Sequence, residues 1–123
     1  MTWLAVLAGG AFGTAARHLV NVASARVLGT SAPYATAMVN LAGSLAIGLL
    51  AGALVARRFS LSLNAQTFVF VGILGGFTTF SSFMLDSLTL LETGRPGQAV
   101  LNLGGQLLAG LMLVYAGYRL GQM

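Results

Sequence analysis

Residues 65–91, AQTFVFVGILGGFTTFSSFMLDSLTLL, decide the fold of this chain. An apolar helix of about 20 residues crosses the hydrocarbon core of a bilayer, and this stretch exceeds that length with Asp86 as its one charged side chain. Its apolar residues follow one another without strict alternation, which favours a helix over a strand of a membrane barrel. The stretch therefore predicts a transmembrane helix.

The composition extends this prediction to the whole chain. Hydrophobic residues make up 57% of it and charged residues 7%, whereas soluble domains carry about 25% charged residues. So few charges cannot keep a surface in water, so we expect the surface to face lipid. The 17 glycines agree with this, because glycine lets membrane helices approach closely. No basic stretch precedes the first apolar run, which indicates a first membrane helix rather than a cleaved signal peptide.

Three polar interruptions divide the chain, at residues 26–33, 57–64 and 92–97. We expect an all-α membrane protein, a single domain over residues 1–123 with four transmembrane helices. Their predicted ranges are 3–25, 35–56, 65–91 and 97–120.

The charges give the chain almost no preferred orientation. Four spans place Arg57, Arg58 and Arg119 on one side of the membrane. The other side receives Arg26 and Arg95, with Arg17 inside the first span. The positive-inside rule then has little to act on. Two copies inserted in opposite directions can pair about an axis in the membrane plane, so we expect an antiparallel, dual-topology homodimer. The scattered arginines do not form the basic patch of a nucleic-acid-binding protein.

Small residues recur four positions apart, a spacing that places both on one helix face and allows close packing. The pairs are Gly9/Gly13, Gly48/Gly52, Gly72/Gly76, Gly105/Ala109 and Gly117/Gly121.

The run GGFTTFSSF at residues 75–83 predicts a break in the third helix near mid-membrane. Two glycines followed by closely spaced hydroxyl residues make a poor continuous helix. A break frees backbone carbonyls for a cation and N–H groups for an anion. Phe80 and Phe83 are three residues apart and share a face. The alternative is a kinked helix whose hydroxyls bond to their own backbone and whose phenylalanines face lipid.

Other polar residues inside the spans are candidates for function because polar groups are costly in lipid. Asn40, Asn102 and Gln106 can offer N–H donors to an anion or join helices as structural bridges; the sequence leaves both open. Asn102 and Gln106 lie four residues apart on one face. Arg17 either reaches an interface or sets a positive potential at an anion entrance. We expect Asp86 to bond to neighbouring donors.

The chain lacks the residues of a familiar enzyme. It has one histidine, two carboxylates and no cysteine, which excludes thiol chemistry and the usual metal sites. We expect no enzymatic activity.

The motifs resemble those of a known family. GGFTTFSSF at residues 75–83 closely resembles the signature of the Fluc fluoride channels, also called the CrcB family. GGAFG at residues 9–13 followed by Arg17-His18, and VNLAG at residues 39–43, resemble that family's first-span and second-span motifs. The resemblance runs through the whole chain in order.

The resemblance implies a passive, fluoride-selective channel in the cytoplasmic membrane, an antiparallel dimer with two pores around a structural sodium ion. It implies that Gly75 and Thr78 give backbone carbonyls to sodium and that Arg17 lies near the vestibule. The implied pore phenylalanines are Phe80 and Phe83. The other residues expected along the anion pathway are Asn40, Thr79, Ser81, Ser82, Asn102 and Gln106.

One departure from the family pattern concerns the fourth span. The family places hydroxyl residues one and two turns beyond the position of Gln106, where this chain has Gly110 and Val114. One alternative is therefore a non-conducting partner subunit of a heterodimeric channel. A second alternative, a small proton-coupled multidrug transporter, requires a carboxylate in the first span, and that span has none.

Overall fold

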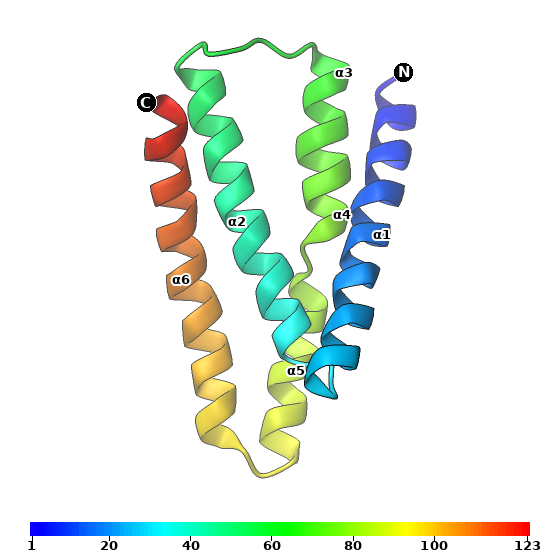
Figure 1. The fold of residues 1–123 in the computed structure, drawn as a ribbon, viewed down its shortest axis with the longest axis vertical. Coiled ribbons are helices and arrows are strands. Elements are labelled where there is room, and N and C mark those ends of the chain that lie inside the picture. Colours follow the sequence, from blue (N-terminus) through cyan, green and yellow to red (C-terminus); the bar gives the residue numbers. More distant parts are fainter.

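The computed structural model describes residues 1–123, and all of its regular structure is helical, as the sequence predicts. The helices form four rods. They run side by side, and both chain ends lie at the same end of the bundle (Figure 1). The third rod, Leu63–Glu92, consists of several consecutive helical segments. The elements are α1 (Thr2–Leu28), α2 (Tyr34–Val55), α3 (Leu63–Gln66), the π-helix η1 (Thr67–Leu74), α4 (Gly75–Phe77), α5 (Phe80–Glu92) and α6 (Pro96–Gln122).

The helix ends follow local sequence signals. Gly29 ends α1 in the left-handed conformation, with φ 75°, which glycine adopts without steric cost. The Ser62 side chain caps α3 by accepting from the Ala65 N–H. Pro96 occupies the first position of α6, where its missing N–H leaves no bond unmade. The rods extend past the predicted ranges by up to three residues, except that α2 ends one residue earlier.

Three of the four rods are long and apolar enough to cross a membrane. They are Tyr34–Val55, Leu63–Glu92 and Pro96–Gln122. The α1 helix has sufficient length but is not among them, because Arg17 and His18 lower the hydropathy of its second half.

Glycines fix the contact between α1 and the first part of the third rod. A Cβ added at Gly9 would lie closer than 3.0 Å to backbone atoms of Phe68 and Gly72. A Cβ at Gly13 would meet the Ile73 carbonyl equally closely. The two backbones therefore touch, and no side chain fits between them.

A second glycine seam joins α2 to α6. Cβ atoms added at Gly48 and Gly52 would lie closer than 3.0 Å to backbone atoms of Val114 and Tyr118. Gly117 and Gly121 are equally close to the backbone of α2. Gly105 differs, because nothing lies within 4 Å of its added Cβ. Four of the five small-residue pairs named from the sequence thus lie at tight helix contacts.

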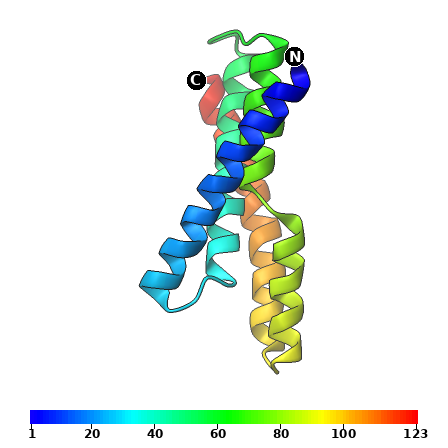
Figure 2. The same cartoon turned by 90° about the vertical axis from the view of Figure 1, so that its right-hand side faces the viewer.

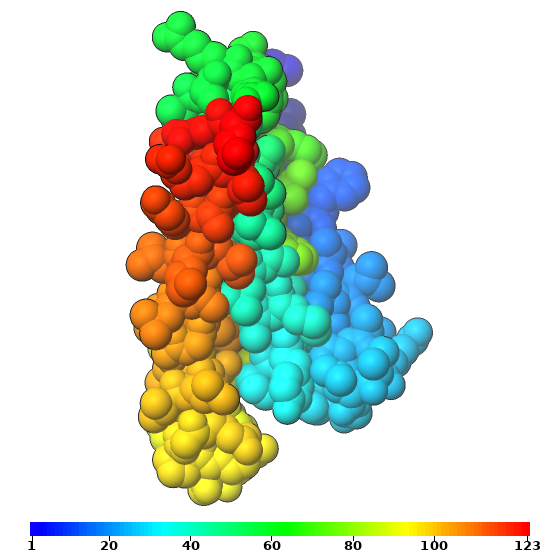
Figure 3. All heavy atoms as spheres, turned by 60° about the vertical axis from the view of Figure 1, so that its left-hand side comes forward, coloured from blue at the N-terminus to red at the C-terminus, as the bar shows by residue number.

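Away from the chain ends the bundle divides into two prongs. One prong is the end of α1 with the start of α2, and the other is α5 with the start of α6 (Figure 2). In the space-filling view the turn between α5 and α6 stands clear of the α1–α2 side (Figure 3). No Cα atom of α1 lies within 8 Å of a Cα atom of α5. The division begins where the third rod changes direction.

The third rod breaks at Thr78 and Thr79, as the sequence predicts. Their backbones are extended, with φ −82°, ψ 160° at Thr78 and φ −152°, ψ 118° at Thr79. The helix restarts at Phe80, capped by the Thr79 hydroxyl, which accepts from the Ser82 N–H at 3.3 Å. The break redirects the chain into the second prong.

Candidate functional site

The helix break leaves Thr79 without helical hydrogen-bond partners, and a side chain from α2 replaces them. The Thr79 N–H donates to Asn40 Oδ1 at 2.8 Å. Asn40 Nδ2 donates to the Thr79 carbonyl at 3.0 Å. An unpaired buried backbone group costs about 1–3 kcal/mol, so Asn40 stabilises the break by pairing both groups, as a neighbouring backbone would.

Asn40 is also the start of a chain of side-chain amides. Its Nδ2 donates to Gln106 Oε1 at 2.8 Å, and Gln106 Nε2 donates to Asn102 Oδ1 at 2.8 Å. Asn102 Nδ2 then donates to Ser87 Oγ at 3.0 Å. Ser87 donates to the Phe83 carbonyl at 2.8 Å. The chain of bonds joins α2, α6 and α5 around the break, so Asn102 and Gln106 do act as bridges between helices.

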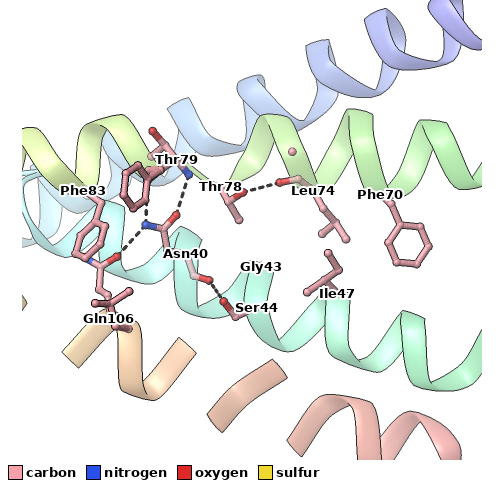
Figure 4. A pocket seen from close by; sticks show the side chains of 13 residues that line it. Asn40, Gly43, Ser44, Ile47, Phe70, Leu74, Thr78, Thr79, Phe83 and Gln106 are labelled. Atoms are coloured by element: carbon pink, nitrogen blue, oxygen red, sulfur yellow. Dashed lines mark hydrogen bonds between the residues drawn. The ribbon is translucent and has the colours of Figure 1, made fainter. Parts of the chain in front are cut away.

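A cavity of about 370 Å³ opens beside the break (Figure 4). Asn40, Thr79 and Gln106 supply its polar wall. Phe80 and Phe83 also line it, with ring centroids 5.9 Å apart in an edge-to-face arrangement. Phe83 is buried and Phe80 is 69% exposed. Two aromatic rings thus stand next to hydrogen-bonding groups.

Ser44 is a lining residue that the sequence analysis did not single out. Its hydroxyl donates to the Asn40 carbonyl at 2.7 Å, and it lines the cavity. A Cβ added at Gly110 would lie 3.4 Å from Ser44 Oγ. A hydroxyl from α2 therefore stands beside a position where the family pattern places one from the fourth span.

A second cavity, of about 350 Å³, lies between α1, α2 and the start of α5. It is strongly polar and contains Arg17, which was expected at a vestibule. Its lining residues are Thr14, Arg17, His18, Asn21, Thr36, Val39, Thr79, Ser81 and Ser82. Thr79 also lines the first cavity, so it forms part of the wall between the two.

The hydroxyls at the break do not all behave alike. Thr78 bonds back to the Leu74 carbonyl at 2.9 Å, as the alternative of a kinked helix expects. The Thr79, Ser81 and Ser82 hydroxyls instead lie close to one another, with Thr79 Oγ1 3.1 Å from Ser82 Oγ. All three residues line the second cavity, and each hydroxyl can either donate or accept a hydrogen bond there.

Gly75 and Thr78 are among the residues that line the first cavity. In an unbroken helix the Gly75 carbonyl would accept from the Thr79 N–H, which here bonds to Asn40. Gly75 is exposed. Arg17 approaches the Thr78 carbonyl at 3.4 Å, a long contact. A carbonyl oxygen freed at a helix break is the ligand type that a hard cation prefers, but one chain supplies too few such oxygens for a complete shell.

The structure differs from two expectations drawn from the sequence, those for Asn102 and Asp86. Asn102 lines neither cavity; it lies behind Gln106 in the chain of amides. Asp86 makes no side-chain hydrogen bond, and its buried Oδ2 lacks a partner, so the expectation that it bonds to neighbouring donors is wrong within one chain.

The two cavities together offer neutral donors and aromatic ring edges. Amide and hydroxyl groups donate hydrogen bonds to an anion without titrating. A phenylalanine edge carries partial positive charge and attracts an anion weakly. Such a lining can replace the water around a small anion without trapping it. The arrangement suits passage of an anion better than covalent chemistry.

Comparison with known proteins agrees with the sequence motifs. Residues 4–118 match the family described as CrcB-like protein, Camphor Resistance (CrcB). A relative from Agrobacterium fabrum is 44% identical over 117 residues, which cover 95% of this chain and 93% of the relative. One from Rhodospirillum centenum is 47% identical over 119 residues, covering 90% and 93%.

A third relative, from Rhodopseudomonas palustris strain BisB5, is 42% identical over 120 residues, covering 98% of this chain and 96% of the relative. All three are named fluoride-specific ion channel FluC. For the family, these names confirm the expectation of an ion channel rather than an enzyme. The match over nearly the full length shows that the chain belongs to the CrcB-like family.

Proposed function

We propose that this chain is the subunit of a fluoride-selective channel that passes fluoride passively out of the cell across the cytoplasmic membrane. The observation that carries the proposal is the cavity at the helix break. There Phe80 and Phe83 stand beside the hydrogen-bonded amides of Asn40 and Gln106. The names of the relatives support fluoride as the ion.

Fluoride demands such a lining because it is small and holds its water strongly. Dehydration requires donors that approach closely, and the Gln, Ser and Thr side chains that line the two cavities can provide them. Conduction also requires that the ion leave again. In this proposal Arg17 sets a positive potential in the second cavity, while the first cavity has no full charge among its lining residues. The ion is drawn in by charge and then passed along neutral groups.

An antiparallel homodimer would complete the site. The first cavity is open to the surface, where Phe80 is 69% exposed and Gly75 is also exposed. A second copy inserted in the opposite direction can cover this face and bring its own phenylalanines and donors. We propose that α1 crosses the membrane with the other three rods, its Arg17 sheltered by the polar cavity rather than facing lipid.

A structural sodium ion fits this dimer. The carbonyls of Gly75 and Thr78 from two subunits would supply four oxygens, the ligand type that hard cations prefer. When bound, sodium would join the two breaks and neutralise their carbonyl dipoles. The chain's own residues hold the break in place without it, because Asn40 pairs with Thr79 directly.

The alternative of a non-conducting partner subunit rests on Gly110 and Val114. Neither residue lines a cavity at the break, which favours a conducting homodimer, because hydroxyls at these two positions would not border the cavities where we place the anion. The multidrug-transporter alternative still lacks its carboxylate, since no Asp or Glu lies in α1.

The test is ion release from liposomes. The purified chain is reconstituted into liposomes loaded with potassium fluoride or potassium chloride, and release is followed with ion-selective electrodes after valinomycin is added. We expect rapid fluoride release, little chloride release and none from empty liposomes. Equal release of both ions would contradict the proposal. A chain that is stable only with a second gene product would support the partner-subunit alternative.

A further inference from the structure

The amide chain at the break has a direction that its two ends impose. It begins at the Thr79 N–H, which can only donate, and it ends at the Phe83 carbonyl, which can only accept. Each amide between them must therefore accept from the preceding group and donate to the next. A reversed Gln106 or Asn102 would place two donors or two acceptors against each other, so both amide orientations are fixed.

Counting N–H groups along this chain separates used donors from spare ones. Asn40 Nδ2 has two hydrogens, and both are taken, by the Thr79 carbonyl and by Gln106 Oε1. Gln106 Nε2 also has two, and one is taken by Asn102 Oδ1. Gln106 is 8% exposed and lines the first cavity. The second N–H of Gln106 Nε2 therefore has no hydrogen-bond partner within the protein.

We infer that Gln106 presents this spare N–H as the fixed amide donor to the anion in the first cavity, and that Asn102 and Ser87 are positioning residues that hold it there. Asn40 then serves chiefly to clamp the break, because its own donors are occupied. This inference rests on the proposed function and names the donor within that site.

The positioning role follows from what Asn102 and Ser87 touch. Asn102 accepts from Gln106 and donates to Ser87, yet it lines neither cavity. Ser87 is 3% exposed, and it ends the row of hydrogen bonds by donating to the Phe83 carbonyl. Without the bond from Gln106 to Asn102, or the bond from Asn102 to Ser87, the Gln106 amide could rotate and donate its spare N–H to another acceptor.

A double-mutant cycle tests the inference through fluoride release from liposomes. In the otherwise unchanged chain, we expect Asn102→Leu to slow release about three- to tenfold, the range that loss of one hydrogen bond covers. In a Gln106→Met background the same change should have no further effect, because the group that Asn102 positions is gone. An equal slowing in both backgrounds, or none in either, would overturn the inference.

A hydroxyl pair on α5 provides a second arm in case Asn102→Leu does not fold. Ser87 and Thr89 each donate to the carbonyl four residues before them, but only Ser87 also receives a bond from Asn102. Ser87→Ala should slow release and Thr89→Ala should not. The slowing by Ser87→Ala should also vanish in the Gln106→Met background.

The outcomes distinguish this inference from the proposed function. If the unchanged chain releases fluoride but Ser87 and Asn102 act independently of Gln106, the inference fails alone. If the unchanged, folded chain releases no fluoride, the proposed function fails and the inference fails with it.

Discussion

The bundle holds its helices together in two different ways at its two ends. Toward the chain termini, α1 meets the third rod and α2 meets α6 through glycines, with backbone against backbone. Around the break, α2, α5 and α6 are joined by side-chain amides and hydroxyls. The glycine seams leave no room for an ion. The polar half lines the two cavities at the break, so the difference separates close-packed helix contacts from a region with space and hydrogen-bonding groups for the proposed anion.

The largest effect should come from the amide that stabilises the break. Asn40→Leu leaves the Thr79 N–H and carbonyl unpaired, at a cost of about 2–6 kcal/mol for two buried groups. We expect loss of most folded protein, measured by thermal unfolding in detergent, and no fluoride release. The control is Asn64→Leu, since Asn64 is exposed and its side chain makes no hydrogen bond. Equal stability of the two variants would show that the break does not depend on Asn40.

A single methyl group on α6 should disrupt the glycine contact between α2 and α6. Gly117→Ala places a Cβ 2.6 Å from the Leu45 carbonyl, and we expect such overpacking to destabilise the protein by about 1–3 kcal/mol. Gly105→Ala on the same helix meets nothing within 4 Å and should be neutral or stabilising, because alanine favours helix. Thermal unfolding of both variants measures the difference. A seam that tolerated Gly117→Ala as well as Gly105→Ala would not be close-packed.

The smallest effect is expected where the two halves meet, at Gly110. An added Cβ there lies 3.4 Å from Ser44 Oγ, so Gly110→Ser fits with little adjustment. Because Gly110 lines neither cavity at the break, fluoride release should change by no more than about twofold, less than one hydrogen bond's usual effect. A large gain in release would instead favour the partner-subunit alternative, since the chain would then lack a donor it needs.

The sequence predicts the fold well because its signals are local. Long apolar runs separated by Gly, Pro and Arg give the rods, and Gly75-Gly76 followed by hydroxyls gives the break. The π-helix at residues 67–74 was not foreseen. Its sequence, TFVFVGIL, has no helix-breaking pair. Its backbone packs against Gly9 and Gly13 of α1, which are far from it in the sequence.

The site is only partly readable from sequence. The spacing of Asn102 and Gln106 shows that they share a helix face, but not that only Gln106 borders the cavity. Ser44 escapes notice because a helical serine usually bonds to its own backbone, and this one does so too. Its place in the wall of the first cavity depends on how α2 packs beside α6. Such roles arise from packing between helices that are far apart in sequence.

Two aromatic pairs allow the most direct test of the account. Phe80 lies edge-to-face against Phe83 at the break, and Phe12 lies edge-to-face against Phe68 at the glycine seam. Their exposed fractions are nearly equal, 69% for Phe80 and 67% for Phe12. Each is replaced by isoleucine, and fluoride release from potassium fluoride-loaded liposomes is measured with a fluoride electrode after valinomycin is added. We predict that Phe80→Ile slows release more than about tenfold, equivalent to about 1.4 kcal/mol, and that Phe12→Ile leaves it unchanged. Equal release from both variants would contradict the claim that the anion passes through the break.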